Sequence, residues 1–386
     1  MLDIIVVGAG PAGLYSALLL AKEGFDVAVL EEHGEIGTPT HCTGIVSDEI
    51  SDLFKVPESI VLSRPGVCKV IAPSGKAVAF ASNDERIAVI DRAQLDAELG
   101  SAAQQAGAEI RTAFRVDRIV SDARWVEVSG TRGQREYARA CILAGGVGYG
   151  LQRQLGLPLP PLMLPSAQLE VDTSHSDTTV ELHVGQGHAP AGFAWLVPIV
   201  RERRARLKVG LMARGDAAVH LSRFLDRSAV RERLAAEPGT PTRRLLPLGP
   251  ASRTYDHRVL VVGDAAGLTK PTTGGGIFYA LLSALLAAEC LVGALRRDEL
   301  QASRLRDYER LWRTHLDSHF QVSTCVRRLF AKMTDDEIEI VLSAMERDDV
   351  QQVLGRTARF NWHGSMIRAL LRQRGIKSVL LQALLR

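Results

Sequence analysis

The start of the chain alternates apolar runs with a glycine-rich turn. Asp3–Val7 is a short run rich in β-branched residues, and it leads directly into Gly8-Ala9-Gly10-Pro11-Ala12-Gly13. After this turn, apolar residues recur at helical spacing, at Leu14, Ala17, Leu18 and Ala21. A second apolar run, Val27–Leu30, ends at the acidic Glu31. The pattern predicts a strand, a tight turn, a helix and a second strand.

A related pattern occurs near residue 260. Arg258–Val262 reads as a fully buried strand that ends in Gly263-Asp264-Ala265-Ala266-Gly267. The triplet Gly274–Gly276 then opens the apolar stretch Ile277–Leu295, whose one charge is Glu289. Length alone would permit this stretch to span a membrane. Its centre, rich in Ala and Leu, favours a helix enclosed by other elements of the protein.

The intervening segments read as further pieces of the same domain. Val67–Ile71 and Ala77–Ala81 flank a turn and predict a hairpin. Asp91 is the expected cap of a helix that runs to about Ala106. Strands are expected within residues 110–128 and again over residues 140–144.

A different region begins at a cluster of prolines between Pro158 and Pro165. Three antiparallel strands are expected, over Val180–Val184, Phe193–Val200 and Arg206–Met212, followed by a helix from about Ala217 to Leu234. After residue 303 the pattern is helical, with a capping box at Thr334 and Glu337.

These patterns together predict an α/β fold in three parts. A discontinuous Rossmann-like domain is expected over residues 1–150 and 251–300. An inserted antiparallel β-sheet over residues 151–250 would form the wall of a substrate pocket. A helical region is expected over residues 301–386.

Composition narrows the class of protein. Of 386 residues, 46% are hydrophobic and 24% charged, which excludes a disordered or fibrous chain. The net charge of +3 gives no sign of nucleic-acid binding. The five cysteines form no CxxC pair, so neither a metal site nor a local redox disulfide is expected. We read no export signal in the apolar start, and a reducing, cytoplasmic setting fits the cysteines best.

Charge is distributed unevenly along the chain. Residues 351–386 carry seven basic and no acidic side chains, so the remaining 350 residues have a net charge of 3 − 7 = −4. An apolar stripe follows helical spacing at the C-terminal end, at Ile376, Val379, Leu380, Ala383 and Leu384. This helix could dock on the protein or contact the inner face of a membrane peripherally.

The first glycine turn has the spacing of a dinucleotide site. Gly8 permits the tight turn, Gly10 lets a pyrophosphate approach the backbone, and Gly13 lets the helix pack on the strand. The helix N-terminus supplies N–H groups and the positive end of a dipole. Glu31 would accept hydrogen bonds from ribose hydroxyls, which favours a dinucleotide without a 2′-phosphate.

The second glycine motif favours FAD over NAD as the cofactor. Asp264 and Gly274–Gly276 resemble the motif of FAD-dependent oxidoreductases of the glutathione-reductase and p-hydroxybenzoate-hydroxylase type. The resemblance implies that Asp264 binds the ribityl chain and that the next helix points its N-terminus at the flavin. No second GxGxxG occurs, so no separate nicotinamide domain is expected. The residues expected to bind FAD are Gly8, Gly10, Ala12, Gly13, Glu31, Glu32, Cys42, Thr43, Arg92, Val116, Gly263, Asp264, Pro271, Gly274, Gly275, Gly276 and Ile277.

Four segments, spread over nearly the whole chain, resemble the geranylgeranyl reductase family, which includes archaeal digeranylgeranylglycerophospholipid reductases. The first two are residues 39–47, around Cys42, and residues 192–198, where Phe193 and Val197 replace the family's usual Tyr and Phe. The other two are Gly263–Gly276, with Pro271 and Ile277, and the expected helices after Tyr308 and Trp312. The resemblance implies hydride transfer from reduced flavin to an isoprenoid double bond of a prenyl lipid. Cys42 would donate the proton, and Phe193, Trp195 and Pro198 would bind the substrate. The electron donor would be NAD(P)H or a reduced electron carrier.

Alternatives stay open at this point. The pattern from Phe193 to Pro198 also resembles a motif of flavin-dependent halogenases, for which Lys76 is the candidate lysine, and a flavin-dependent monooxygenase is equally compatible. A flavin-binding protein without catalytic activity is a third reading. Cys42 could be an inert buried thiol, Trp195 a core residue and Arg92 a surface residue.

Overall fold

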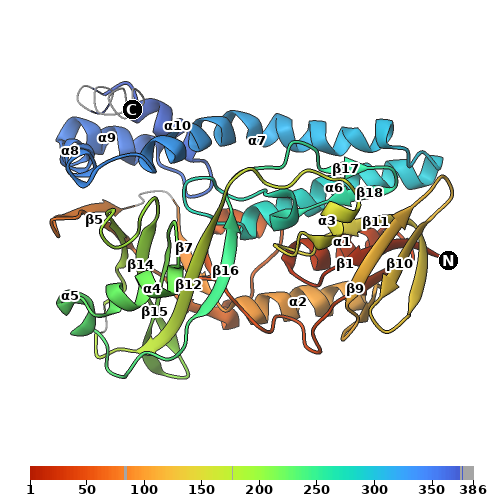
Figure 1. The fold of residues 1–386 in the computed structure, drawn as a ribbon, viewed down its shortest axis with the longest axis horizontal. Coiled ribbons are helices and arrows are strands. Elements are labelled where there is room, and N and C mark those ends of the chain that lie inside the picture. The colour runs from red at the N-terminus through yellow and green to blue at the C-terminus, as the bar shows by residue number, and fades with distance from the viewer. Residues whose placement is uncertain (82–84, 176, 374–375, 377–386) are drawn as a thin grey trace.

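The computed structural model describes residues 1–81, 85–175, 177–373 and 376. The molecule is elongated, with one β-sheet towards each end and a layer of long helices along one side (Figure 1). The sheet that contains the N-terminus lies at the right of Figure 1, and the second sheet lies at the left.

The first sheet has eight strands and a parallel centre. Its order is β17-β18-β11-β1-β2-β8, with β10 added to β11 and β9 added to β10. The central strand β1 pairs in parallel with β11 and β2, so that Ile5 lies opposite Cys141 and Ala28. The strands are β1 (Leu2–Val7), β2 (Val27–Leu30), β8 (Glu109–Arg111), β9 (Val116–Ser121), β10 (Val126–Gly130), β11 (Arg135–Leu143), β17 (Tyr255–Asp256) and β18 (Val259–Val261).

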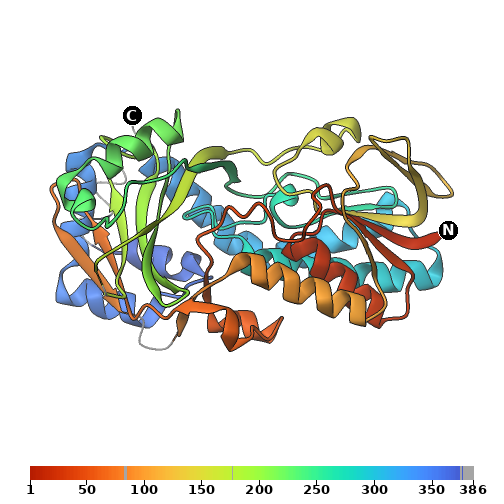
Figure 2. The ribbon, with the colours of Figure 1, turned by 90° about the horizontal axis from the view of Figure 1, so that it is seen from below.

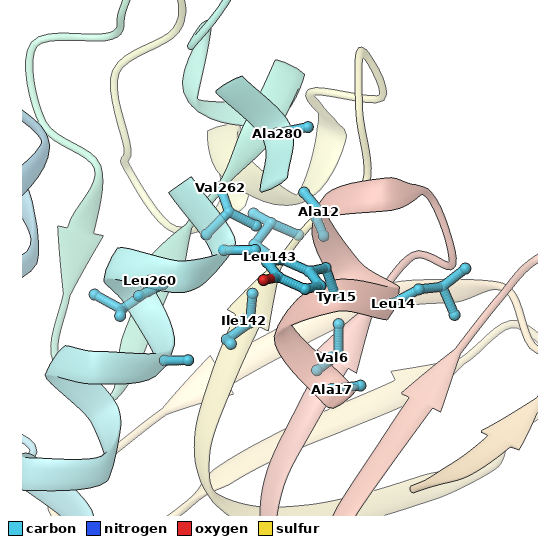
Figure 3. Close-up of a cluster of buried hydrophobic side chains, with 14 of the residues drawn as sticks. Val6, Ala12, Leu14, Tyr15, Ala17, Ile142, Leu143, Leu260, Val262 and Ala280 are labelled. Carbon is cyan, nitrogen blue, oxygen red and sulfur yellow. The ribbon is translucent and has the colours of Figure 1, made fainter. Parts of the chain in front are cut away.

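Helices cover this sheet and complete its core. Figure 2 shows α1 (Pro11–Lys22) beside α2 (Arg92–Gln105). Side chains of β1, α1, β11, β18 and α6 (Ile277–Arg297) meet in one cluster (Figure 3). The short helix α3 (Gly150–Gln154) packs near β9. The predicted cap of α2 is confirmed, because the Asp91 carboxylate accepts from the backbone N–H groups of Ala93 and Gln94.

Among the described residues, α6 is the one helix long and apolar enough to cross a membrane, with a mean hydropathy of 2.0 over its most apolar window. It packs against α1 on one side and α7 (Ala302–Phe330) on another, and 61% of that window is buried. The helix therefore belongs to the core of the folded chain, as its Ala-rich sequence predicts.

The second sheet has seven strands in the order β16-β12-β15-β14-β13-β5-β6. Its three central strands match the predicted antiparallel strands, whereas β12 and β16 were not predicted because prolines obscure their alternation. The strands are β5 (Val67–Ile71), β6 (Ala77–Ala81), β12 (Met163–Asp172), β13 (Val180–Val184), β14 (Phe193–Arg201), β15 (Arg204–Met212) and β16 (Thr242–Pro247).

The assignment of the β5–β6 hairpin to the first domain was wrong. β5 pairs in parallel with β13, with Cys68 opposite Val180 and Val70 opposite Leu182, so the hairpin extends the second sheet. A hairpin satisfies its internal hydrogen bonds wherever it docks, and its sequence does not specify which sheet edge it joins. A small third sheet lies between the two, formed by β3 (Ile45–Ser47), β7 (Ile87–Ile90) and β4 (Val61–Ser63), with 3₁₀ turns η1 (Asp48–Asp52) and η2 (Glu58–Ile60).

One face of the second sheet is covered by α4 (Ala217–Leu225) and α5 (Ser228–Arg231). A single helix to Leu234 was predicted here, but the extended backbone of Arg227, with φ −65° and ψ 132°, separates two shorter helices. The C-terminal helices α8 (Asp335–Met345), α9 (Asp348–Thr357) and α10 (His363–Leu370) lie above the same sheet in Figure 1. The predicted capping box at Thr334 and Glu337 is confirmed at the start of α8.

Of the predicted C-terminal apolar stripe, Ile376 lies within the described residues. It is buried, and it packs in a cluster with Val350, Leu354 and Leu370. The other members of the stripe, Val379, Leu380, Ala383 and Leu384, lie outside the described residues. Membrane contact by this segment stays a prediction.

Trp312 on α7 anchors that helix to the first domain. It is fully buried, and its indole N–H donates to Thr254 Oγ1 at 2.9 Å. We expect Trp312→Ala to lower the free energy of unfolding by about 3–5 kcal/mol, because it removes a large core side chain. Urea denaturation checks this, with Leu311→Ala as control, since Leu311 is the next residue and is 36% exposed. Equal losses in both variants would contradict the anchoring role.

Candidate active site

One continuous cavity joins the two sheets. Its volume is about 2510 Å³, and its wall runs from the first glycine turn past β12 and β14 to the C-terminal helices. Pockets for a single small ligand are usually about 300–1,000 Å³. The cavity therefore has room for a cofactor and a second large ligand.

The first glycine turn is open at Gly10, where a dinucleotide would approach, and is closely packed against the protein at Gly8 and Gly13. Gly8 has φ +103°, and a Cβ on it would lie 2.6 Å from Ala144 O. A Cβ on Gly13 would lie 2.0 Å from Gly8 O, whereas one on Gly10 would meet nothing within 4 Å. The protein packs tightly behind the turn and is open in front of it, as a bound pyrophosphate requires.

Glu31 is held at the end of β2 by the turn itself. Its Oε2 accepts from Ala9 N–H at 2.7 Å, and its Oε1 accepts from His33 N–H at 3.0 Å. The carboxylate is thus fixed at the cavity wall, where it could accept from ribose hydroxyls. Glu32 also lines the cavity, but its half-exposed carboxylate lies 3.7 Å from Arg115.

Arg92 lines the cavity, and its guanidinium is paired with the carboxylate of Asp96. Its Nε and Nη2 donate to the two oxygens of Asp96 at 3.0 and 2.8 Å. Burial opposes the charge of Arg92, but Asp96 more than offsets this and raises the pKa of Arg92. The cation therefore persists in the cavity wall, where it faces Cys42 and Asp264.

The second glycine motif forms a loop at the start of α6. Asp264 lies in the short turn η3 (Gly263–Ala266), and Gly274 has φ +71°. A Cβ on Gly276 would lie 2.8 Å from Asp264 Oδ1. Burial raises the pKa of Asp264, although Arg92 and Arg244 oppose this. Thr273 Oγ1 is buried without a partner among the described residues. An orphaned hydroxyl beside a glycine-lined helix N-terminus fits the polar part of a flavin cofactor.

Most residues predicted to bind FAD lie on the wall of this cavity. They are Gly8, Gly10, Ala12, Glu31, Glu32, Cys42, Thr43, Arg92, Val116, Asp264, Gly274, Gly275, Gly276 and Ile277. Gly13, Gly263 and Pro271 do not line it. Gly13 and Gly263 lie behind the wall because each packs against backbone or core methyl groups there. Pro271 is buried in the loop.

A glutamine that the sequence analysis missed organises the segment around Cys42. Gln168 on β12 donates from Nε2 to Cys42 O at 3.2 Å. Its Oε1 accepts from Thr43 Oγ1 at 3.0 Å and from Trp195 Nε1 at 3.2 Å. One side chain therefore fixes both predicted reaction-site segments relative to each other.

Lys208 on β15 was also missed. It is 4% exposed, its Nζ donates to Thr43 O at 2.9 Å, and burial lowers its pKa. Cys42 Sγ accepts from Gly44 N–H at 3.3 Å and interacts electrostatically with both Lys208 and Arg92. The sequence signal was a lysine within an apolar strand, Leu207-Lys208-Val209.

Phe193 and Trp195 form part of the cavity wall, with ring centroids 5.8 Å apart. Gly210 beneath them is required, because a Cβ there would lie 2.5 Å from Trp195 Cζ2. Pro198, which was predicted to bind substrate, does not line the cavity. Side chains alternate along β14, so Pro198 belongs to the opposite face from Trp195, and its carbonyl accepts from Ser63 Oγ at 2.7 Å.

Beyond these aromatic residues the cavity becomes an apolar channel. Its walls are the inner face of the second sheet and helices α7 to α10. The channel residues from these helices, and from the turn between α7 and α8, include Phe330, Met333, Ile338, Leu342, Leu354, Met366, Ile367 and Leu370.

Replacing Gly10 tests the dinucleotide site without disturbing the fold. Gly10 has φ −82°, which any residue adopts, and a methyl group there meets no protein atom within 4 Å. We expect Gly10→Ala to keep the melting temperature and to weaken FAD binding at least about tenfold, or about 1.4 kcal/mol. Flavin absorbance after titration measures this. Gly34→Ala, outside the cavity and equally unhindered, is the control; FAD affinity unchanged by Gly10→Ala would refute the site.

His41 predicts a pH dependence of stability. Burial, with Arg244, lowers its pKa to about 4 from 6.5. The unfolded chain therefore binds more protons than the folded chain between these values, and stability falls as the pH drops from 6.5 to 4. We expect His41→Gln to reduce this loss, by at most about 1.4 kcal/mol per pH unit. Urea denaturation at several pH values measures it, and the exposed His175→Gln should match wild type.

The comparisons with known proteins agree with this geometry. Residues 6–55 match the model of an NAD(P)-binding Rossmann-like domain. Digeranylgeranylglycerophospholipid reductase 2 of Methanopyrus kandleri is 31% identical over 371 residues, which cover 91% of this chain and 92% of the relative. The Methanocaldococcus jannaschii digeranylgeranylglycerophospholipid reductase is 29% identical, with 89% and 90% of the two chains covered.

Solved structures confirm the fold. A geranylgeranyl bacteriochlorophyll reductase-like protein of Thermoplasma acidophilum superposes with a TM-score of 0.86 at 20% identity, covering 99% of both chains. Halogenase PltM in complex with phloroglucinol and FAD superposes with a TM-score of 0.69 at 16% identity, covering 99% of this chain and 90% of the halogenase. The predicted FAD-dependent oxidoreductase fold is confirmed, and the chain belongs to the digeranylgeranylglycerophospholipid reductase family.

Proposed function

We propose that this protein is an FAD-dependent reductase that saturates isoprenoid double bonds of a prenyl lipid. The observation that carries the proposal is the continuity of the cavity. It connects a dinucleotide cradle, through Cys42 and Trp195, to an apolar channel between the second sheet and α7–α10. A long hydrocarbon chain fits such a channel because burying its methylene groups is favourable.

Reduced FAD, when bound, supplies a hydride for one alkene carbon. The protein must then deliver a proton to the other carbon, so that two hydrogens add across the double bond. Phe193 and Trp195 line the site with apolar ring surface. Gln168 donates to Cys42 O and accepts from Trp195 Nε1, and these two hydrogen bonds hold Trp195 and the Cys42 segment in place relative to each other.

Cys42 is the proton donor in this proposal. The thiol lies on the cavity wall between the cradle and the channel. When Sγ gives up its proton it becomes negatively charged, and the cations of Arg92 and Lys208 stabilise that charge. The Gly44 N–H group donates to the same sulfur. Solvent water then returns a proton to the thiolate.

Lys76, the candidate lysine for the halogenase alternative, does not lie at the site. Lys76 lies in the turn between β5 and β6, where it is 46% exposed, and it forms an ion pair with Glu346 outside the cavity. The similar halogenase structures share the fold, whereas the relatives at about 30% identity are named as reductases. A nicotinamide or a reduced carrier as electron donor, and a peripheral membrane contact, are further parts of the proposal.

An anaerobic assay tests the function directly. Dithionite-reduced protein is mixed with a geranylgeranyl lipid, and the lipid is analysed by mass spectrometry. We expect two hydrogens to be gained per reduced double bond, with return of the oxidised flavin spectrum. An unchanged lipid, or a product that contains oxygen or halogen and requires oxygen, would contradict the proposal.

Replacing Cys42 tests its assigned role. We expect Cys42→Ala to bind FAD normally and to lower turnover at least about 100-fold, because a general acid contributes this much or more. Cys325→Ala removes an exposed thiol on α7 and should turn over like wild type. Single-turnover flavin reoxidation measures both variants, and full activity of Cys42→Ala would exclude the thiol as donor.

A further inference from the structure

The glycine loop at the start of α6 carries a buried lysine on the cavity wall. Lys270 is 5% exposed. Its backbone N–H donates to Gly275 O at 3.0 Å, and its carbonyl accepts from Gly274 N–H at 2.8 Å. A Cβ on Gly275 would lie 2.6 Å from Lys270 Cε and 3.2 Å from Nζ. The ammonium group therefore lies directly against the glycine triplet.

No carboxylate forms an ion pair with Lys270 within the part of the chain that the structure describes. Nζ donates to Phe360 O at 2.8 Å and lies 3.6 Å from the centroid of the Phe360 ring. Glu49 and Glu85 act on Lys270 through space. Both accept hydrogen bonds from the segment Phe360–Trp362 instead.

A buried cation without an ion-pair partner is costly unless another negative charge approaches it. Burial lowers the pKa of Lys270 to about 7, and such a negative charge would raise it again. His363, which also faces Lys270, has a pKa lowered to about 3 by burial and is neutral at pH 7. The N-terminus of α6 adds positive potential at the same place. The two features together make this wall a site for negative charge.

The chemistry of FAD indicates which negative charge this is. The N-terminus of α1, in front of Gly10, would accommodate the diphosphate of FAD. The remaining negative charge that FAD can carry develops on its ring upon two-electron reduction. Asp264, on the far side of Gly276, interacts with Arg92 and Arg244 instead. We propose that Lys270 stabilises the negative charge of the reduced flavin ring and thereby raises the reduction potential of bound FAD.

This inference rests on FAD binding, one part of the proposed function, and it does not depend on the lipid. The test compares wild type with Lys270→Met and Lys270→Gln. Neither residue is charged or larger than lysine, and Gln can still donate to Phe360 O. FAD stoichiometry and circular dichroism verify folding and loading. The midpoint potential of bound FAD is then measured against reference dyes at pH 7.

We expect both variants to bind FAD. At the same applied potential, the ratio of reduced to oxidised FAD should be at least about tenfold lower than in wild type, which corresponds to a shift of about −30 mV in the midpoint potential of a two-electron couple. Lys76→Met removes a positive charge from an exposed turn and should keep the wild-type potential. If either Lys270 variant binds FAD with an unchanged potential, the inference is overturned; an effect confined to the KM for lipid overturns it too. Wild-type protein that binds no FAD would instead overturn the proposed function as well.

Discussion

The close packing of α1 on the first sheet is the constraint on which the site depends. A methyl group at Gly13 would come within 2.0 Å of Gly8 O, so α1 can approach the end of β1 only because Gly13 lacks a side chain. This approach sets the position of the α1 N-terminus at the cavity wall. It also brings Ala9 N–H within 2.7 Å of Glu31 Oε2, which ties the end of β2 to the turn. One steric requirement thus fixes the helix dipole, the open face at Gly10 and the ribose acceptor together.

The second determinant is the polar contact between the second sheet and the loop that carries Cys42. Gln168 binds Cys42 O, Thr43 Oγ1 and Trp195 Nε1, and Lys208 binds Thr43 O. These groups are buried or nearly so, and leaving any of them without its partner would cost about 1–3 kcal/mol. The segment that carries Cys42 is therefore held against the second sheet although it belongs in sequence to the first domain. The aromatic wall and the thiol face the same cavity for this reason.

Several positively charged side chains lie around the site, although the net charge of the whole chain is small. Arg92, Lys208 and Lys270 are all largely buried on or beside the cavity wall, and they come from α2, β15 and the loop before α6. Only Arg92 is directly paired with a carboxylate, that of Asp96. Such an arrangement favours chemistry in which negative charge develops transiently, on a thiol or on a cofactor. The chain as a whole has a net charge of only +3, so the local field depends on where the charges are buried.

The sequence by itself determined the local structural features of this protein. The turn Gly8–Gly13, the Asp91 cap and the helix after Gly276 each follow from residues adjacent in the chain, because turn geometry, capping and helical periodicity are local. The resemblance of four segments, spread over nearly the whole chain, was sufficient to indicate the family.

What only the tertiary structure decided is which of these segments meet. The hairpin β5–β6 joins the distant β13, Pro198 faces away from the cavity, and Gln168, Lys208 and Lys270 reach the site from elements far apart in the chain. Each of these outcomes depends on non-local pairing, burial and strand register, and none of them leaves a periodic signal in the sequence.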